Sequence, residues 1–259
     1  MNRFLLAGLI VSAAPSLALA QTFASYQPVS GGGVARWSQL WQDPGPNGND
    51  LDGDAVCWTE FVLASPASIN HIEWWGTGAC ELGFRIEFWP QDPGTVAYQP
   101  LGVFYYGGNH NVHRTAGFDT TAYTTTPGPG GILHHSLDLA TPVALPANDA
   151  ANPRWFIAII GLTHQAYVPW NWSQSTAGNH TFQFIRGEGP QFRALGDGRA
   201  VVISNTSCPA DWNHDLVANS QDFFDFIGDF FAGSADFSGD GQTNSQDFFD
   251  FVTAFFVGC

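Results

Sequence analysis

Residues 211–222 have the sequence Asp211-Trp-Asn213-His-Asp215-Leu-Val217-Ala-Asn219-Ser-Gln-Asp222, and this pattern recurs 25 positions later as Asp236-Phe-Ser238-Gly-Asp240-Gly-Gln242-Thr-Asn244-Ser-Gln-Asp247. Each copy places oxygen-bearing side chains at positions 1, 3, 5, 9 and 12 of a 12-residue segment. This is the spacing at which a loop surrounds a hard cation such as Ca²⁺ with oxygen ligands. The duplication therefore predicts two calcium loops, which indicates a binding module and not a catalyst.

Each loop is followed by nearly the same sequence, which predicts an amphipathic helix over 220–231 and another over 245–256. Apolar residues recur at i, i+3, i+4 and i+7 in both, as Phe223, Phe226, Ile227 and Phe230 and again as Phe248, Phe251, Val252 and Phe255. Four more phenylalanines enlarge the apolar surface beyond what two short helices can bury: Phe224, Phe231, Phe249 and Phe256. We interpret most of these rings as core, and some as a candidate exposed patch for a partner protein.

This loop–helix duplication resembles a dockerin, and more specifically the GC-type dockerin-like anchoring modules at the C-termini of secreted proteins in planctomycete-type bacteria. The resemblance covers residues 208–259, which begin with Cys208-Pro209 and end with Gly258-Cys259. The segment departs from an EF-hand because position 12 is Asp and because no helix precedes the first loop. The resemblance implies calcium ligands from five side chains per loop and the position-7 carbonyl: Asp211, Asn213, Asp215, Val217, Asn219 and Asp222, then Asp236, Ser238, Asp240, Gln242, Asn244 and Asp247.

Two further positions of the loops matter for binding. Position 6 normally turns sharply with φ > 0, and it is Gly241 in the second loop but Leu216 in the first. A Leu there costs roughly 1 kcal/mol or more, so we expect the first site to be weaker or distorted. In cellulosome-type dockerins, positions 10 and 11 help to select the cohesin partner. Both copies here have the same pair at these positions, which permits two docking orientations related by a pseudo-twofold axis: Ser220 and Gln221, and Ser245 and Gln246.

The N-terminus predicts export. A positive start at Arg3, an apolar run and an Ala18-Leu-Ala20 cleavage site indicate a secretory signal peptide over residues 1–20, and hence an extracellular or cell-surface protein. Four cysteines in an oxidising compartment predict two disulfides, for which the sequence alone allows three pairings. We expect Cys208 with Cys259 around the duplicated module, and Cys57 with Cys80 in the first domain.

Charge restricts the partners. The chain has a net charge of −15, and residues 208–259 hold nine aspartates and no Lys or Arg. Crowded carboxylates repel one another, so this segment needs cations to fold compactly. Nucleic acid is a poor partner for such a segment. No later segment approaches 18 consecutive apolar residues, so we expect no membrane span.

Residues 21–207 predict one β-rich domain. Short strand candidates are separated by Gly, Pro, Asn and Asp, at 58–63, 69–75, 84–89, 101–106, 132–139, 155–162, 180–186 and 200–204. Alternation predicts that Ile72 and Trp74 share one face of 69–75, and that Phe84, Ile86 and Phe88 share one face of 84–89. They predict a mainly β domain, an antiparallel β-sandwich of jelly-roll-like type, joined at 204–209 to a small all-α calcium module over 208–259. The loops 43–54 and 119–131 are too rich in Gly and Pro to predict regular structure. The domain is loosely similar to uncharacterised β-sandwich domains of exported bacterial proteins.

Aromatic residues suggest a ligand for this domain. Nine of the ten tryptophans lie in it, and exposed rings stack on sugars. Trp170 and Trp172 are the best candidates for a face that binds a polysaccharide, since residues at i and i+2 share one side of a strand. Trp75 and Trp89 are further candidates. The alternative is that these rings are simply core.

An enzyme is the competing class, because dockerins frequently accompany glycoside hydrolases. Glu60, Glu73 and Glu87 lie in predicted strands, and Glu73 with Glu87 could form an acid and nucleophile about 5–5.5 Å apart. The alternative is that they pair with Arg85 or remain solvated. No catalytic motif supports this class. The sequence thus favours a secreted, non-catalytic protein that a calcium module anchors to a cohesin-like or other surface partner; a small glycoside hydrolase and a structural surface-layer component are the alternatives.

Overall fold

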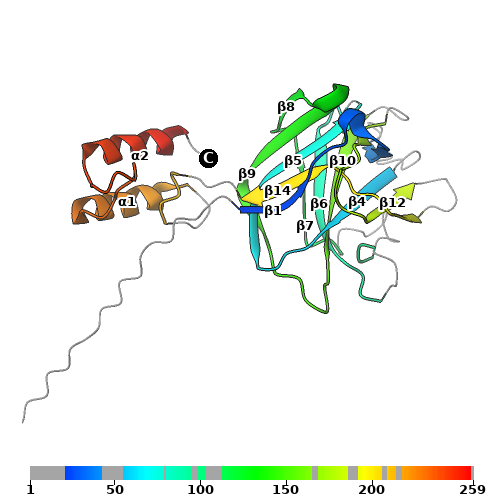
Figure 1. Cartoon of the computed structure of the whole chain (residues 1–259), viewed down its shortest axis with the longest axis horizontal. Coiled ribbons are helices and arrows are strands. Elements are labelled where there is room, and N and C mark those ends of the chain that lie inside the picture. Colours follow the sequence, from blue (N-terminus) through cyan, green and yellow to red (C-terminus); the bar gives the residue numbers. More distant parts are fainter. Residues whose placement is uncertain are drawn as a thin grey trace, which may run out of the picture.

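The structure, a computed structural model, describes residues 21–42, 55–78, 80–94, 99–102, 113–164, 169–185, 192–205, 209–213 and 218–257. The expected signal peptide, the loop 43–54 and the Cys208–Cys259 pair lie outside these residues. Figure 1 shows the strands gathered in two facing layers, with two antiparallel helices outside them. The chain is therefore mostly β up to residue 205 and helical after it.

The first sheet has β5 at its centre. It contains β1 (Gln21–Tyr26), β14 (Val201–Asn205), β5 (Ala67–Thr77), β11 (Asn171–Trp172) and β2 (Arg36–Trp37) in this order, with β9 (Leu133–Leu145) also paired to β5 and β8 (Thr124–Pro127) paired to β9. The second sheet has the order β13 (Phe192–Leu195), β12 (Thr181–Ile185), β4 (Ala55–Phe61), β3 (Gln39–Trp41), β10 (Trp155–Thr163), β6 (Phe84–Pro90) and β7 (Ala116–Thr120). The described residues of this part also include two short 3₁₀ turns, η1 (Ser30–Gly32) and η4 (Pro129–Gly131).

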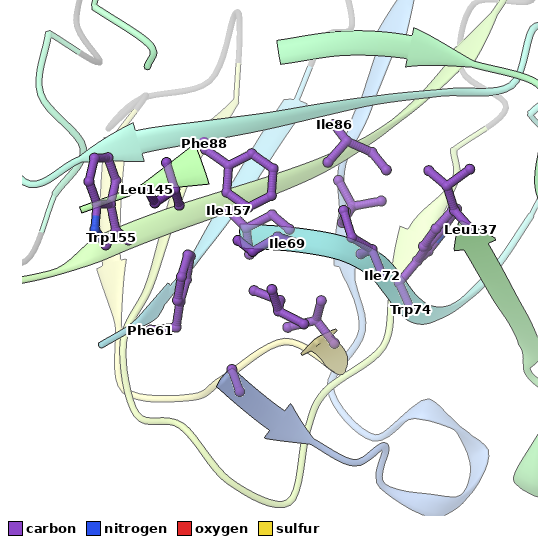
Figure 2. Close-up of a cluster of buried hydrophobic side chains, with 14 of the residues drawn as sticks. Phe61, Ile69, Ile72, Trp74, Ile86, Phe88, Leu137, Leu145, Trp155 and Ile157 are labelled. Carbon is purple, nitrogen blue, oxygen red and sulfur yellow. The ribbon is translucent and has the colours of Figure 1, made fainter. Parts of the chain in front are cut away.

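The main core lies between the two sheets. Ile72 and Trp74 of β5 face Ile86 and Phe88 of β6 and Ile157 of β10, and all five side chains are fully buried. Figure 2 shows these rings and branched chains meeting from strands of both sheets. The predicted alternation along β5 and β6 is confirmed, because the intervening residues point away from this core. Two sheets around one apolar layer are consistent with a β-sandwich.

The second sheet is buried on its other face as well. A second apolar cluster lies there, and it includes Trp58 of β4, Trp89 of β6 and Phe156 of β10. All nine residues of β10 are buried in consequence. A central strand that is covered on both sides has a continuous apolar sequence, as β10 does.

Several details differ from the sequence expectations. β10 pairs in parallel with β3 through Gly161, Leu162 and Thr163, so the second sheet is not purely antiparallel. The segment 119–131 contains β8 and η4, because three β-branched threonines pair with β9. Leu101 and Gly102 form a turn and not the start of a strand, and 103–106 lie outside the described residues. The other seven predicted strands are confirmed, with ends that shift by a few residues.

The helical part contains α1 (Ser220–Ala232) and α2 (Ser245–Val257), both at the predicted places. In the part of the chain that the structure describes, no helix combines the length and the apolarity that a membrane crossing requires.

Candidate metal centre in the repeated loops

Each helix begins at the last residues of a repeated loop. Asn219 caps α1: its side-chain oxygen accepts a hydrogen bond from the Gln221 N–H at 2.7 Å. Asp222 completes a capping box by accepting from the Asn219 N–H at 2.8 Å. The second copy makes the same two bonds, both at 2.8 Å, among Asn244, Gln246 and Asp247. The duplicated sequence therefore folds twice into the same local structure.

Two stacked phenylalanine rings lie where the two copies meet. Phe226 and Phe251 are equivalent residues, and their ring centroids are 3.9 Å apart with planes 6° from parallel. Two flanking contacts match one another, at 5.8 Å and 55° and at 5.6 Å and 54°, in the pairs Phe230–Phe248 and Phe223–Phe255. Each flanking pair becomes the other when the copies are exchanged. A local pseudo-twofold axis therefore passes through the stack.

Position 2 of each loop supplies an aromatic ring to this core. Trp212 meets Phe226 edge-on at 5.0 Å and 86°, and Phe237 meets Phe251 edge-on at 5.6 Å and 85°. These rings join the loops to the helices. Neither ring was among the predicted functional residues, although an aromatic residue at position 2 of both copies was a signal for them.

Backbone N–H groups organise the second loop around two carboxylates. Asp236 accepts from the N–H groups of Gly239, Asp240 and Gly241 at 2.8, 3.0 and 2.7 Å. Asp247, at position 12, accepts from Ser238 at 2.9 Å and from Asn244 at 2.8 Å. These backbone bonds, that from Ser238 first, lower the pKa of Asp247. Gly241 has φ 86°, as predicted for position 6.

The first loop repeats the contacts of position 12. Asp222 accepts from the Asn213 N–H at 3.1 Å and from the Asn219 N–H at 2.8 Å, which are again positions 3 and 9. Asp215, Leu216 and Val217 lie outside the described residues. The weakening of the first site by Leu216 therefore stays a prediction.

The donor set fits a hard cation. The described side chains at positions 1, 3, 9 and 12 offer carboxylate, amide and hydroxyl oxygens, the chemistry that Ca²⁺ prefers. Asp222 and Asp247 are 0% exposed and Asp211 is 4% exposed, in a segment without Lys or Arg. Burying such charges is costly unless hydrogen bonds or a cation compensate. Among the described residues, no three His, Cys, Asp or Glu side chains already converge as a metal cluster.

The predicted partner-contact residues lie at the helix starts. Ser220, Gln221, Ser245 and Gln246 are all exposed. Each glutamine bonds along its own helix, from Gln221 to Asp225 and from Gln246 to Asp250, both at 2.7 Å. The two sites are thus equivalent in structure as well as in sequence.

The predicted sugar-stacking tryptophans are core residues, so that expectation is wrong. Trp170, Trp172 and Trp89 are 0% exposed and Trp75 is 5% exposed. Trp170 and Trp172 do share one side, as predicted, with ring centroids 6.4 Å apart, but that side faces the interior. Trp75 is covered by His134, which stacks on it at 4.6 Å. None of these rings offers a sugar a free face.

The pair of carboxylates considered for the competing glycoside hydrolase class does not form. Glu73 lies on β5 in the first sheet, and Glu87 lies on β6 in the second, each on the side facing away from the common core. The sandwich separates them, so they cannot act on one bond. Glu87 is buried against Arg114 at 2.6 Å and Trp89, and burial raises its pKa. Arg85 pairs with Asp119 at 2.7 and 2.9 Å, and its charge also acts on Glu87, where it lowers the pKa against the larger effect of burial.

Glu60, the third glutamate of that class, lies on β4 and is buried. It contacts Arg154 at 2.5 Å and also the ring of His180. These partners account for its burial, so we interpret it as structural.

The expected Cys57–Cys80 disulfide is not formed in the structure, where both thiols are free. Cys57 is buried on β4, its thiol donates to the Trp37 carbonyl at 3.3 Å, and burial raises its pKa to about 12. Burial raises the pKa of Cys80 too. Both thiols are therefore held in the protonated form that does not exchange readily.

A polar network on the outer face of the first sheet was missed. His71 lies between Asp138 at 2.5 Å and Glu73 at 3.3 Å, and Glu73 also contacts His134 at 2.8 Å. The bond to Glu73 raises the pKa of His71, and the bond to His71 lowers that of Glu73. Alternation placed His71 and Glu73 on one face of β5, but only the pairing with β9 brings the other two residues beside them.

Comparisons of this chain with models of protein families, with curated proteins and with solved structures find no match.

Proposed function

We propose that this is a secreted, non-catalytic protein in which residues 208–259 form a dockerin-like module that binds calcium and anchors the β-rich part to an extracellular or cell-surface protein. The jelly-roll-like arrangement of that β-rich part belongs to the same proposal. The observation that carries the proposal is the repeated bonding of position 12, since Asp222 and Asp247 each accept from positions 3 and 9 of their own loop. Two oxygen-rich loops with the same structure, each joined to one helix of a pair, are suited to binding calcium and a protein partner.

Calcium would be held by the side chains at positions 1, 3, 5, 9 and 12 and by the carbonyl at position 7 of each loop. The ion supplies positive charge to a segment that contains nine aspartates and no Lys or Arg. Its role is structural, because metal binding at such loops is coupled to folding. The residues of the chain do the rest: they fix the loop ends to the helices and present the helices to a partner.

The partner is a cohesin-like or other surface protein that meets the helix starts. The pseudo-twofold axis through Phe226 and Phe251 supports two equivalent orientations, one centred on Ser220 and Gln221 and one on Ser245 and Gln246. The double change Ser245→Asp with Gln246→Arg should then leave binding through the first copy. Loss of all binding with the first copy intact would contradict two equivalent orientations.

The test is retention of the mature chain, residues 21–259, on envelopes of the cells that secrete it. We expect retention in calcium and release in a chelator. A chain with both Asp222→Ala and Asp247→Ala should not be retained, because each change removes the carboxylate that links its loop to its helix.

Asp250→Ala is the matched control, since Asp250 is an aspartate of the same module that lies on the helix and outside both loops. It should still be retained, because it leaves both loops and the Ser220–Gln221 contact site intact, even though Gln246 loses its bond to Asp250. Retention that ignores chelator, or that persists without residues 208–259, would contradict the proposal.

A further inference from the structure

Four phenylalanines of the helical module remain strongly exposed. Phe224, Phe231, Phe249 and Phe256 are 67%, 83%, 62% and 80% exposed. They form two equivalent pairs, because Phe249 and Phe256 occupy in the second copy the places of Phe224 and Phe231 in the first. A soluble chain rarely exposes large apolar groups together without a use for them.

Helix geometry places all four on one face. Phe224 and Phe231 are seven positions apart, so they lie about 20° from each other around α1. They lie on the opposite side of the helix from Asp222, which holds the loop. The axis through the Phe226–Phe251 stack relates antiparallel neighbours and therefore brings the counterparts on α2 to the same face.

This face, which we call the outer phenylalanine face, carries no charge. The residues between the exposed rings on this face are apolar or small: Ile227 and Gly228 on α1, and Val252 and Thr253 on α2. The acidic residues of the helices, such as Asp225 and Asp250, lie about 100° or more around each helix from the exposed rings. The negative charge of the module therefore does not occupy the face itself.

We propose that the outer phenylalanine face binds the same face of a second copy of this chain, giving a dimer in which two helix pairs form a four-helix bundle. A face with its own twofold symmetry is suited to an isologous contact. Among the residues that the structure describes, no further α-helix supplies the second layer that completes such a bundle. Gly228 is open on this side, where an added side chain would meet nothing within 4 Å, so a partner helix can approach closely.

The exposed area is large enough for a dimer. At roughly 200 Å² per phenylalanine, the four rings offer about 580 Å² per copy. Two copies would bury about 1,200 Å², which is the lower end for specific interfaces. This size predicts a reversible dimer in the micromolar range and not an obligate one.

Sedimentation velocity of the mature chain, residues 21–259, tests this inference. Samples from roughly 1 to 200 µM in calcium and about 0.15 M salt should shift from monomer to dimer. The double variant Phe231→Ser with Phe256→Ser should weaken association by about tenfold or more. Circular dichroism should show unchanged helix, because these rings contribute little to the core.

Three further variants make the outcome decisive. Phe224→Ser with Phe249→Ser tests the same face independently and should also weaken the dimer. Phe231→Leu with Phe256→Leu keeps the apolar area and should still dimerise. Val62→Ser is the matched control, because Val62 is 56% exposed in the β-rich part; it should dimerise normally. A chain that stays monomeric throughout, or a dimer that both serine variants retain, would overturn the inference.

Discussion

The β-rich part and the helical module solve the same problem, burial of aromatic rings, in opposite ways. The sandwich buries Trp74, Trp170 and Trp172 in an interior built from many strands that are distant in sequence. The module buries Phe226 against its own counterpart Phe251, so one short sequence used twice generates its core. Duplication makes the module simple, but it leaves each copy dependent on the other, whereas the sandwich spreads its stability over two sheets.

The largest test of this difference is Phe226→Ala. Removing a fully buried ring should destabilise the module by about 3–5 kcal/mol, since the stack and its edge contacts disappear together. Phe251→Ala should cost the same. Thermal unfolding followed through the helical dichroism measures the loss, while the tryptophan signal of the sandwich should not change.

Phe224→Ala is the matched control for the stack, because the same residue type two positions away is 67% exposed. It should change stability by less than about 0.5 kcal/mol. Equal effects of Phe224→Ala and Phe226→Ala would contradict a core centred on the stack.

In the sandwich, the corresponding weak point is a buried charge. Arg114→Ala leaves the fully buried Glu87 without its cation and should cost about 3 kcal/mol. The pKa of Glu87 is higher in the folded chain than in the unfolded chain, so its ionisation destabilises the fold as the pH rises. The stability that Arg114→Ala loses should therefore increase above the ordinary carboxyl pKa. Urea unfolding at acidic and neutral pH measures this dependence.

Arg85→Ala provides the surface comparison, since its partner Asp119 is about half exposed. It should cost no more than about 1 kcal/mol. Adding Glu87→Gln to Arg114→Ala should recover part of the loss. A deficit that does not depend on pH would argue against an uncompensated Glu87 carboxylate.

A third test separates two histidines of the first sheet. Burial lowers the pKa of His135 to about 4, so the unfolded chain takes up a proton first and stability falls as the pH drops from about 6.5 towards 4. The full effect is of order 2–3 kcal/mol. His135→Gln should flatten this acidic limb in unfolding measured across that range.

The pKa of His71 is shifted in the opposite direction, so its effect on stability has the opposite pH dependence. Its raised pKa contributes stability that is present below the unfolded value and is lost as the pH rises through the folded one. His71→Gln should therefore weaken the fold at acidic pH and spare it at alkaline pH. Identical profiles for the two variants would contradict these assignments.

The smallest effect tests the equivalence of the two copies. Asn219→Ala and Asn244→Ala each remove a side-chain bond to a backbone N–H at a helix start. Each variant should lower the free energy of unfolding by about 1 kcal/mol, and the two losses should be equal when measured in chelator. Ser220→Ala, next to the cap, should change little. Unequal losses in the free energy of unfolding would show that the two copies, although alike in structure, do not contribute equally to stability.

The sequence predicted the module better than the sandwich, because the module's contacts are local and repeated. Loop spacing and the i, i+3, i+4, i+7 pattern located both helices. In the sandwich, alternation identified the inward residues of β5 and β6, yet it could not show that the outer side of β6 is also covered, as Trp89 is. Strands of two or three residues, such as β2 and β11, exist only through distant pairing and have no signal of their own. Glu73 and Glu87 do not form a pair because alternation shows which face of a strand a residue occupies, but not which of the two sheets contains that strand.

Calcium titration of residues 21–259 by calorimetry, with helical dichroism measured in parallel, tests the central claim most directly. Two binding sites should appear, with Asp222→Ala removing one, Asp247→Ala removing the other and Asp250→Ala removing neither. Helix should increase, or its melting temperature rise, on binding. Absence of calcium binding to the unchanged chain would reduce residues 208–259 to a phenylalanine-rich helix pair and contradict the anchoring account.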